Sequence, residues 1–100
     1  MKFEEMGNMS GKTMMLLPGT CCDWQINFER VIPYLSEKYH LICVNYDGFD
    51  GTDSVFPDMI TVTEKIEKYI KENHGGRLDG AIGSSLGSSF VGQLVQRKNV

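Results

Sequence analysis

Five consecutive residues, Gly83-Ser84-Ser85-Leu86-Gly87, have the types and the spacing needed for nucleophilic catalysis. This G-x-S-x-G pattern lies between a short apolar segment and a stretch with helical spacing, which is typical of the strand-to-helix turn called a nucleophile elbow. Its central serine must occupy a sharp turn that lifts the hydroxyl clear of the sheet. Strand and helix then approach so closely that only very small residues fit two positions to either side, as Gly83 and Gly87 do.

Ser85 is therefore the candidate nucleophile. The helix that follows directs its free N–H groups and its positive dipole end toward any negative charge that forms there. The backbone N–H of Leu86 is a candidate donor to an oxyanion. The pentapeptide alone has little specificity in a chain rich in glycine and serine, and the alternative is a strand-to-helix connection without chemistry.

Composition excludes several classes of protein. The chain has 100 residues with 41% hydrophobic and 23% charged side chains, which is ordinary for a globular domain. A net charge of −3 gives no basic surface for nucleic acid. No apolar run approaches the ~20 residues of a membrane span, so no membrane partner is expected. Three cysteines without a secretory signal predict reduced thiols and a cytoplasmic protein.

Apolar runs without alternation predict strands that are buried on both faces. These strands are expected at residues 13–17, 40–46 and 78–82. A short edge strand is expected near residues 2–6. Because predicted helices separate the three buried strands, the chain is expected to form an α/β fold with a parallel-stranded sheet flanked by helices.

Apolar residues at helical spacing predict helices over about 25–38, over about 59–73 and after the elbow. Pro33 lies inside the first helix, where it should introduce a kink or start a new turn. Thr61 and Glu64 have the spacing of a capping box at the start of the second helix.

The two histidines, His40 and His74, are expected to stand alone, so the sequence predicts no metal site. One begins a predicted strand and the other ends the helix that leads into the next strand. Both should therefore lie at the N-terminal edge of the parallel sheet, opposite Ser85. We expect them to be solvated or capping residues rather than catalytic ones.

The order and spacing of these elements resemble the N-terminal half of an α/β-hydrolase. The resemblance is carried by an apolar strand ending in a glycine loop, a helix, a second strand with its loop, and the elbow, at residues 16–20, 31–39, 40–50 and 83–87. It implies that residues 1–100 are a partial hydrolase domain with three core strands, two crossover helices and the helix after the elbow. It also implies that strand 13–17 lies between the other two.

The resemblance further implies a serine hydrolase that acts on a small ester, thioester or amide by acyl transfer, with no metal or organic cofactor. Ser85 would be the nucleophile, and the N–H groups of Leu86 and Thr20 would hold the oxyanion. Pro18-Gly19 replaces the His-Gly of many members, but the backbone donor that follows is retained. The acid and the histidine of the triad are expected beyond residue 100.

The loop after strand 13–17 should share its edge of the sheet with Ser85, because ligands bind outside the carboxyl ends of parallel strands. Gly19, Cys21 and Trp24 are therefore candidate substrate-binding residues. For the cysteine, and for Cys22 beside it, the alternative is a small packing residue. For the tryptophan the alternative is packing on the core.

A different class of function remains open, namely a non-catalytic small-ligand binding or interaction module with a relic elbow. Acyltransferase and C–C hydrolase chemistry use the same elbow. These 100 residues alone are expected to be a poor catalyst, because they lack a general base. Their sheet edge beside strand 78–82 is expected to need the C-terminal half of the domain or to self-associate.

Overall fold

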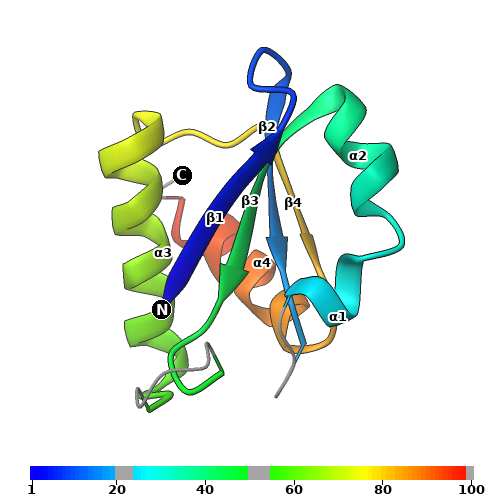
Figure 1. The fold of residues 1–100 in the computed structure, drawn as a ribbon. Helices are drawn as coiled ribbons and strands as arrows, with labels where there is room; N and C mark the ends of the chain where they lie inside the picture. Colours follow the sequence, from blue (N-terminus) through cyan, green and yellow to red (C-terminus); the bar gives the residue numbers. More distant parts are fainter. Residues whose placement is uncertain (20–23, 50–54, 99–100) are drawn as a thin grey trace.

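The computed structural model describes residues 1–19, 24–49 and 55–98 (Figure 1). Within these ranges one mixed sheet has the strand order β1-β3-β2-β4. Its strands are β1 (Lys2–Gly7), β2 (Lys12–Leu17), β3 (Tyr39–Asn45) and β4 (Gly80–Gly83). β2 pairs in parallel with both β3 and β4. The predicted parallel α/β core is therefore confirmed, with strand β2 between the other two.

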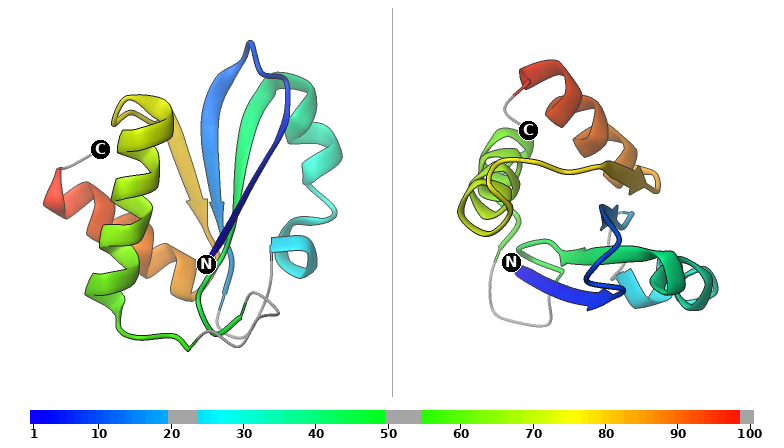
Figure 2. Two further views of the ribbon diagram at one scale, coloured as in Figure 1. Left: turned by 60° about the vertical axis from the view of Figure 1, so that its left-hand side comes forward. Right: turned by 90° about the horizontal axis from the view of Figure 1, so that it is seen from above.

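Helices cover both faces of this sheet. They are α1 (Trp24–Phe28), α2 (Ile32–Lys38), α3 (Met59–His74) and α4 (Leu86–Arg97). α3 and α4 lie on one face, and α1 and α2 lie on the other (Figure 2). None of the helices in the described part of the chain has the length and hydrophobicity that a membrane crossing requires.

The strand side chains divide the core into two clusters, because successive residues of a strand point to opposite faces. Met15, Leu17 and Ile42 pack toward α3 and α4, whereas Leu16 and Leu41 pack toward α1 and α2. All five are fully buried. Burial on both faces explains why β2 and β3 are continuous apolar runs rather than alternating ones.

The helix predicted over residues 25–38 is two helices. α1 ends at Phe28 and α2 begins at Ile32. Pro33 lies in the first turn of α2, where its missing N–H is not needed for the helical hydrogen bonds. The proline therefore starts a new turn, which is one of the two outcomes expected for it.

The predicted capping box at the start of α3 is wrong. The N-cap is Asp58, whose Oδ1 accepts a hydrogen bond from the backbone N–H of Thr61 at 2.7 Å. Thr61 is thus in the first turn of the helix and does not cap it. Gly75 ends the helix in the left-handed conformation, with φ of 64°.

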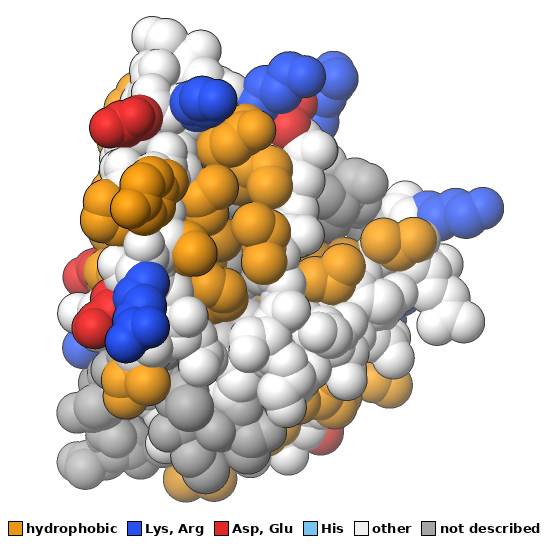
Figure 3. Space-filling view, turned by 90° about the vertical axis from the view of Figure 1, so that its right-hand side faces the viewer, with side chains coloured by type: hydrophobic (Ala, Val, Ile, Leu, Met, Phe, Trp, Pro, Cys, Tyr) orange, Lys and Arg blue, Asp and Glu red, His pale blue; other side chains and the backbone are white. Residues whose placement is uncertain are grey.

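The two outermost strands of the described sheet, β1 and β4, have different surroundings. The edge strand expected near residues 2–6 is confirmed as β1, which pairs antiparallel with β3. Beside β4 there is instead an apolar hollow of about 310 Å³, lined by Leu78, Gly80, Ala81, Val91, Leu94 and Val95. Figure 3 shows hydrophobic side chains gathered on this side of the molecule.

Candidate active site

The turn between β4 and α4 has the strained backbone that a nucleophile elbow requires. Ser85 has φ of 53° and ψ of −109°. These angles are close to the first central position of a type II′ turn, which glycine strongly favours. A side chain held there costs about 1–3 kcal/mol. The sharp, strained turn predicted at Ser85 is confirmed.

Two glycines make this turn sterically possible. A Cβ atom on Gly83 would lie 2.3 Å from the carbonyl carbon of Gly87. A Cβ atom on Gly87 would lie 2.0 Å from the carbonyl oxygen of Leu17 in β2. Both contacts are with backbone atoms, which cannot move aside without moving a strand or helix. The predicted close approach is thus confirmed, and it involves the neighbouring strand β2 as well.

The Ser85 side chain is exposed and is not used by the helix that it precedes. Ser85 is the N-cap residue of α4, yet its side chain makes no capping hydrogen bond. A serine at this position ordinarily accepts a hydrogen bond from the first turn. Ser88 stabilises the turn instead, because its hydroxyl donates to the carbonyl of Gly83 at 3.0 Å. The Ser85 hydroxyl is therefore accessible to a substrate.

The loop after β2 lies against the elbow, as predicted. A Cβ atom on Gly19 would lie 3.5 Å from the Cβ atom of Ser85. The backbone N–H of Gly19 donates to Oδ1 of Asn27 at 2.6 Å. The buried Tyr46 hydroxyl donates to the carbonyl of Pro18 at 2.7 Å, and burial raises the pKa of this phenol, so that it stays a neutral donor. The start of the loop is therefore fixed beside Ser85.

The remaining candidates from this loop have different outcomes. Thr20, Cys21 and Cys22 lie outside the described residues, so their proposed roles stay predictions. Trp24 is 9% exposed and packs in the cluster beneath α1. Its backbone N–H donates to Oδ1 of Asn45 at 2.9 Å. This burial favours the core-packing alternative for Trp24 over substrate binding.

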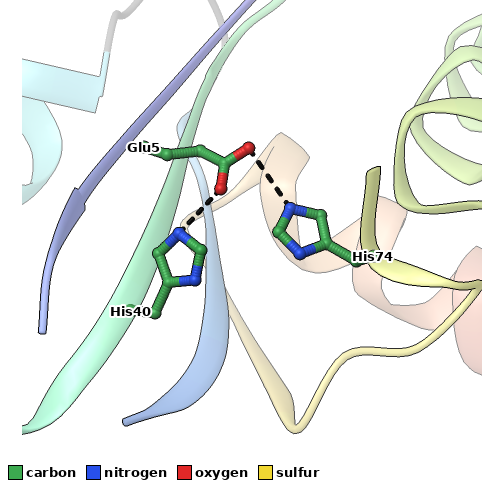
Figure 4. Close-up of side chains that lie close together, drawn as sticks. All are labelled: Glu5, His40 and His74. Carbon is green, nitrogen blue, oxygen red and sulfur yellow. Dashed lines mark hydrogen bonds and ion pairs between the residues drawn. The ribbon is translucent and has the colours of Figure 1, made fainter. Parts of the chain in front are cut away.

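The two histidines do not stand alone, which corrects the sequence-based expectation. Glu5 of β1 lies between His40 of β3 and His74 at the end of α3 (Figure 4). Glu5 Oε1 is 2.7 Å from His40 Nε2, and Glu5 Oε2 is 3.2 Å from His74 Nε2. The histidine side chains are only 12% and 13% exposed, so they are not solvated either.

The expected position of the histidines is confirmed. His40 pairs with Thr13 near the start of β2, whereas Gly83 pairs with Leu17 at its end. The histidine cluster and Ser85 therefore lie at opposite edges of the sheet. Neither His40 nor His74 can act as the base for Ser85.

Comparison with known proteins identifies the fold. A crystal structure of a protein described as an alpha/beta hydrolase family protein, from Desulfitobacterium hafniense, matches with a TM-score of 0.91 and 23% identity, over 99% of this chain and 40% of that one. The chain has the α/β-hydrolase fold. The α/β-hydrolase fold that the sequence resemblance implied is thereby confirmed, and no family model matches the chain.

A curated protein that is named as a dioxygenase is similar in sequence as well. The chain is 32% identical over 72 residues to 1H-3-hydroxy-4-oxoquinoline 2,4-dioxygenase of Pseudomonas putida, a match that covers 70% of this chain and 27% of that protein. A structure of a dioxygenase of the same name matches with a TM-score of 0.83 and 27% identity, over 95% of this chain and 36% of that one. The chain thus spans two fifths or less of the length of these relatives.

Proposed function

We propose that this chain supplies the nucleophile and the oxyanion donors of a cytoplasmic serine hydrolase, which acts on a small ester, thioester or amide by acyl transfer. The observation that carries the proposal is the backbone of Ser85. A serine is held at a positive φ that glycine would adopt more easily, and its exposed hydroxyl is not used as a helix cap. Such strain is retained where a side chain must be presented for chemistry.

The proposed reaction begins when Ser85 Oγ attacks the substrate carbonyl carbon. The carbonyl π electrons move to oxygen, and the backbone N–H groups of Leu86 and Thr20 hold the resulting oxyanion. The leaving group departs with a proton, and water then hydrolyses the acyl-enzyme. The N–H of Leu86 is suited to this role because the first N–H groups of a helix have no intrahelical partner.

The proton that leaves Ser85 needs a base outside residues 1–100. His40 and His74 are at the opposite sheet edge, and no other histidine occurs in the sequence. By resemblance to the family, an acid and a histidine follow beyond residue 100. We therefore propose that activity requires the C-terminal half of the hydrolase domain.

The apolar hollow beside β4 supports the same requirement. In the described part of the chain β4 pairs only with β2, and Val95 next to the hollow is 71% exposed. Unpaired strand edges with apolar surroundings favour association. We propose that the C-terminal half covers this edge, and that residues 1–100 alone self-associate. Sedimentation velocity of the isolated 100-residue piece would contradict this if it showed a stable monomer.

The catalytic proposal is tested by steady-state hydrolysis of a series of short-chain thioesters and p-nitrophenyl esters. Ser85→Ala in the full-length protein is expected to lower kcat by about 10³-fold or more, since removing a serine nucleophile abolishes covalent catalysis. Ser89→Ala is the matched control, because Ser89 is an exposed serine in the first part of the same helix. Equal turnover by the wild type and by Ser85→Ala would contradict the proposal.

The dioxygenase relative supports a second candidate function, namely oxygenation of a hydroxy-oxo-heterocycle by the same fold. Oxygen uptake in the presence of 1H-3-hydroxy-4-oxoquinoline distinguishes this candidate from hydrolysis, which consumes no O₂. Uptake without ester turnover would favour the dioxygenase. Neither activity in a folded full-length protein would favour the binding module with a relic elbow.

A further inference from the structure

We propose that Glu5, His40 and His74 form a binding site for one divalent transition-metal ion of the zinc class. The site lies at the edge of the sheet opposite Ser85 and is independent of the proposed hydrolase chemistry. Its three residues come from β1, β3 and the C-terminal end of α3, which lie far apart in the sequence.

The ligand set is the first argument. Two imidazole nitrogens and one carboxylate are ligands that Zn²⁺ prefers, and three protein ligands leave one position of a tetrahedral ion for water. One ligand atom from each residue can be chosen so that all three lie within 4.8 Å of one another. The hard ions Mg²⁺ and Ca²⁺ prefer sites made of oxygen alone, so this set discriminates against them.

The distances between the three side chains are the next argument. Bond lengths of about 2.0–2.2 Å and tetrahedral angles place zinc ligands about 3.3–3.5 Å apart. The carboxylate oxygens of Glu5 lie 2.7 Å and 3.2 Å from the two Nε2 atoms. In Figure 4 both Nε2 atoms point toward the carboxylate. All three ligand atoms lie within 4.8 Å of one another, so we infer that side-chain adjustment on ion binding would bring them to the spacing that zinc needs.

The burial of His40 gives a second and independent argument. Its Nε2 atom is inaccessible to solvent and has no aligned hydrogen-bond partner among the described residues, despite its proximity to Glu5. A buried polar atom without such a bond is costly, and a bound ion is one way in which proteins satisfy it. The lone pair of this nitrogen would be satisfied by coordination.

A second shell supports the carboxylate. The Tyr69 hydroxyl donates to Glu5 Oε2, and its ring stacks on Phe3 with 3.9 Å between ring centroids. The hydrogen bond from Tyr69 orients the Glu5 carboxylate, as second-shell partners do in metal sites.

A bound ion would connect the edge strand β1 to β3 and to the end of α3. Because a site assembled from residues 5, 40 and 74 does not exist in the unfolded chain, the metal would bind the native state preferentially and stabilise it. The site is therefore expected to act on stability rather than on the reaction at Ser85.

The test is calorimetric titration of the chelator-treated full-length protein with Zn²⁺, after alkylation of the cysteines so that thiols cannot bind the metal. The wild type is expected to bind one equivalent and to melt at a higher temperature when loaded, and a chelator should reverse the shift. His74→Asn is expected to weaken binding at least tenfold, and Mg²⁺ should produce no shift. Glu4→Gln is the matched control, because Glu4 is an exposed acid next to Glu5 on the other face of β1.

A variant with a smaller structural effect keeps the test decisive if a histidine variant does not fold. Tyr69→Phe retains the ring that stacks on Phe3 and removes only the hydroxyl that orients Glu5. It is expected to weaken Zn²⁺ binding about tenfold, as loss of a second-shell partner does. Absence of one-to-one Zn²⁺ binding by the wild type, or equal affinity in wild type, His74→Asn and Tyr69→Phe, would overturn the proposal.

Discussion

The parallel strands of this sheet begin at its N-terminal edge and end at its C-terminal edge. These two edges hold their reactive side chains by different physical means. At the C-terminal edge, Ser85 is presented by its backbone, which has a positive φ and is surrounded by glycines in contact with other backbone atoms. At the N-terminal edge, Glu5, His40 and His74 have negative φ angles and are positioned by strand register and by the end of a helix. Their side chains hold one another through direct contacts.

This difference indicates what each edge can do. A strained backbone orients one hydroxyl toward solvent and leaves it without a partner among the described residues, which suits attack on a substrate. A converging set of imidazoles and a carboxylate leaves His40 Nε2 buried without an aligned hydrogen bond among the described residues, which suits holding an ion or a proton. The N-terminal edge, with its histidine cluster, is thus less suited to substrate chemistry than the C-terminal edge with Ser85.

The largest expected effect is that of a single methyl group at the elbow. Gly87→Ala would place a Cβ atom 2.0 Å from the carbonyl oxygen of Leu17. Because β2 is the central strand of the parallel core, this clash is expected to lower the free energy of unfolding by about 3 kcal/mol or more. Urea denaturation of the full-length protein measures it through the transition midpoint.

Gly92→Ala is the matched control for that substitution. Gly92 lies in the same helix, and a Cβ atom there would meet no atom within 4 Å beyond its chain neighbours and the backbone of its own helix. Replacing a glycine by alanine within a helix is expected to stabilise the protein by about 0.5–1 kcal/mol. If Gly87→Ala and Gly92→Ala shifted the midpoint in the same direction, the backbone contact between α4 and β2 would not have the importance assigned to it.

The C-terminal edge could be predicted from the sequence because its determinants are contiguous. The elbow needs glycines two residues before and after the serine, and this spacing is visible within five residues. Strand β2 is likewise readable, because burial on both faces leaves a continuous apolar run. These features are local, so a single sequence contains them.

The N-terminal edge could not be predicted in the same way. Glu5 reaches His40 only because β1 pairs with β3 instead of forming a hairpin with β2, which follows it directly in the chain. No local pattern determines that choice. The cap of α3, in contrast, is a local feature. Asp58 lies three residues before Thr61, which is the ordinary spacing between an N-cap and the N–H that it binds.

A smaller effect of opposite sign is expected at the serine itself. Ser85→Gly removes a side chain from a conformation that glycine adopts without strain. The relief of strain is expected to exceed the entropy cost of an added glycine and to stabilise the protein by about 1 kcal/mol, with loss of ester turnover. Chemical denaturation of the inactive variant measures this gain, and a lower midpoint than wild type would argue against strain at Ser85.

The smallest expected effect concerns a charge beside the C-terminal edge. Asp47 follows β3, is 5% exposed and forms ion pairs with Lys65 and the N-terminal amino group. Burial raises the pKa of Asp47, but these two partners outweigh it and hold that pKa below the ordinary value of 3.8. Because the Lys65 side chain is 48% exposed, the pair is expected to contribute only about 0.5–1 kcal/mol.

The pH dependence of this contribution follows from the direction of the shift. A carboxyl with a lowered folded-state pKa stabilises the native state above its unfolded pKa, and the contribution is lost as pH falls through the folded pKa. The difference in unfolding free energy between wild type and Asp47→Asn should therefore be constant above about pH 5 and vanish in stronger acid. A difference that grew as the pH fell would contradict the assigned pair.

The most direct test of the account is labelling of the full-length protein with a fluorophosphonate probe, followed by mass spectrometry to locate the adduct. We expect one adduct on Ser85, none in Ser85→Ala, and none on the isolated residues 1–100, which lack the base. A folded full-length protein that forms no adduct, or that forms it equally in Ser85→Ala, would show that the elbow does not present a catalytic serine.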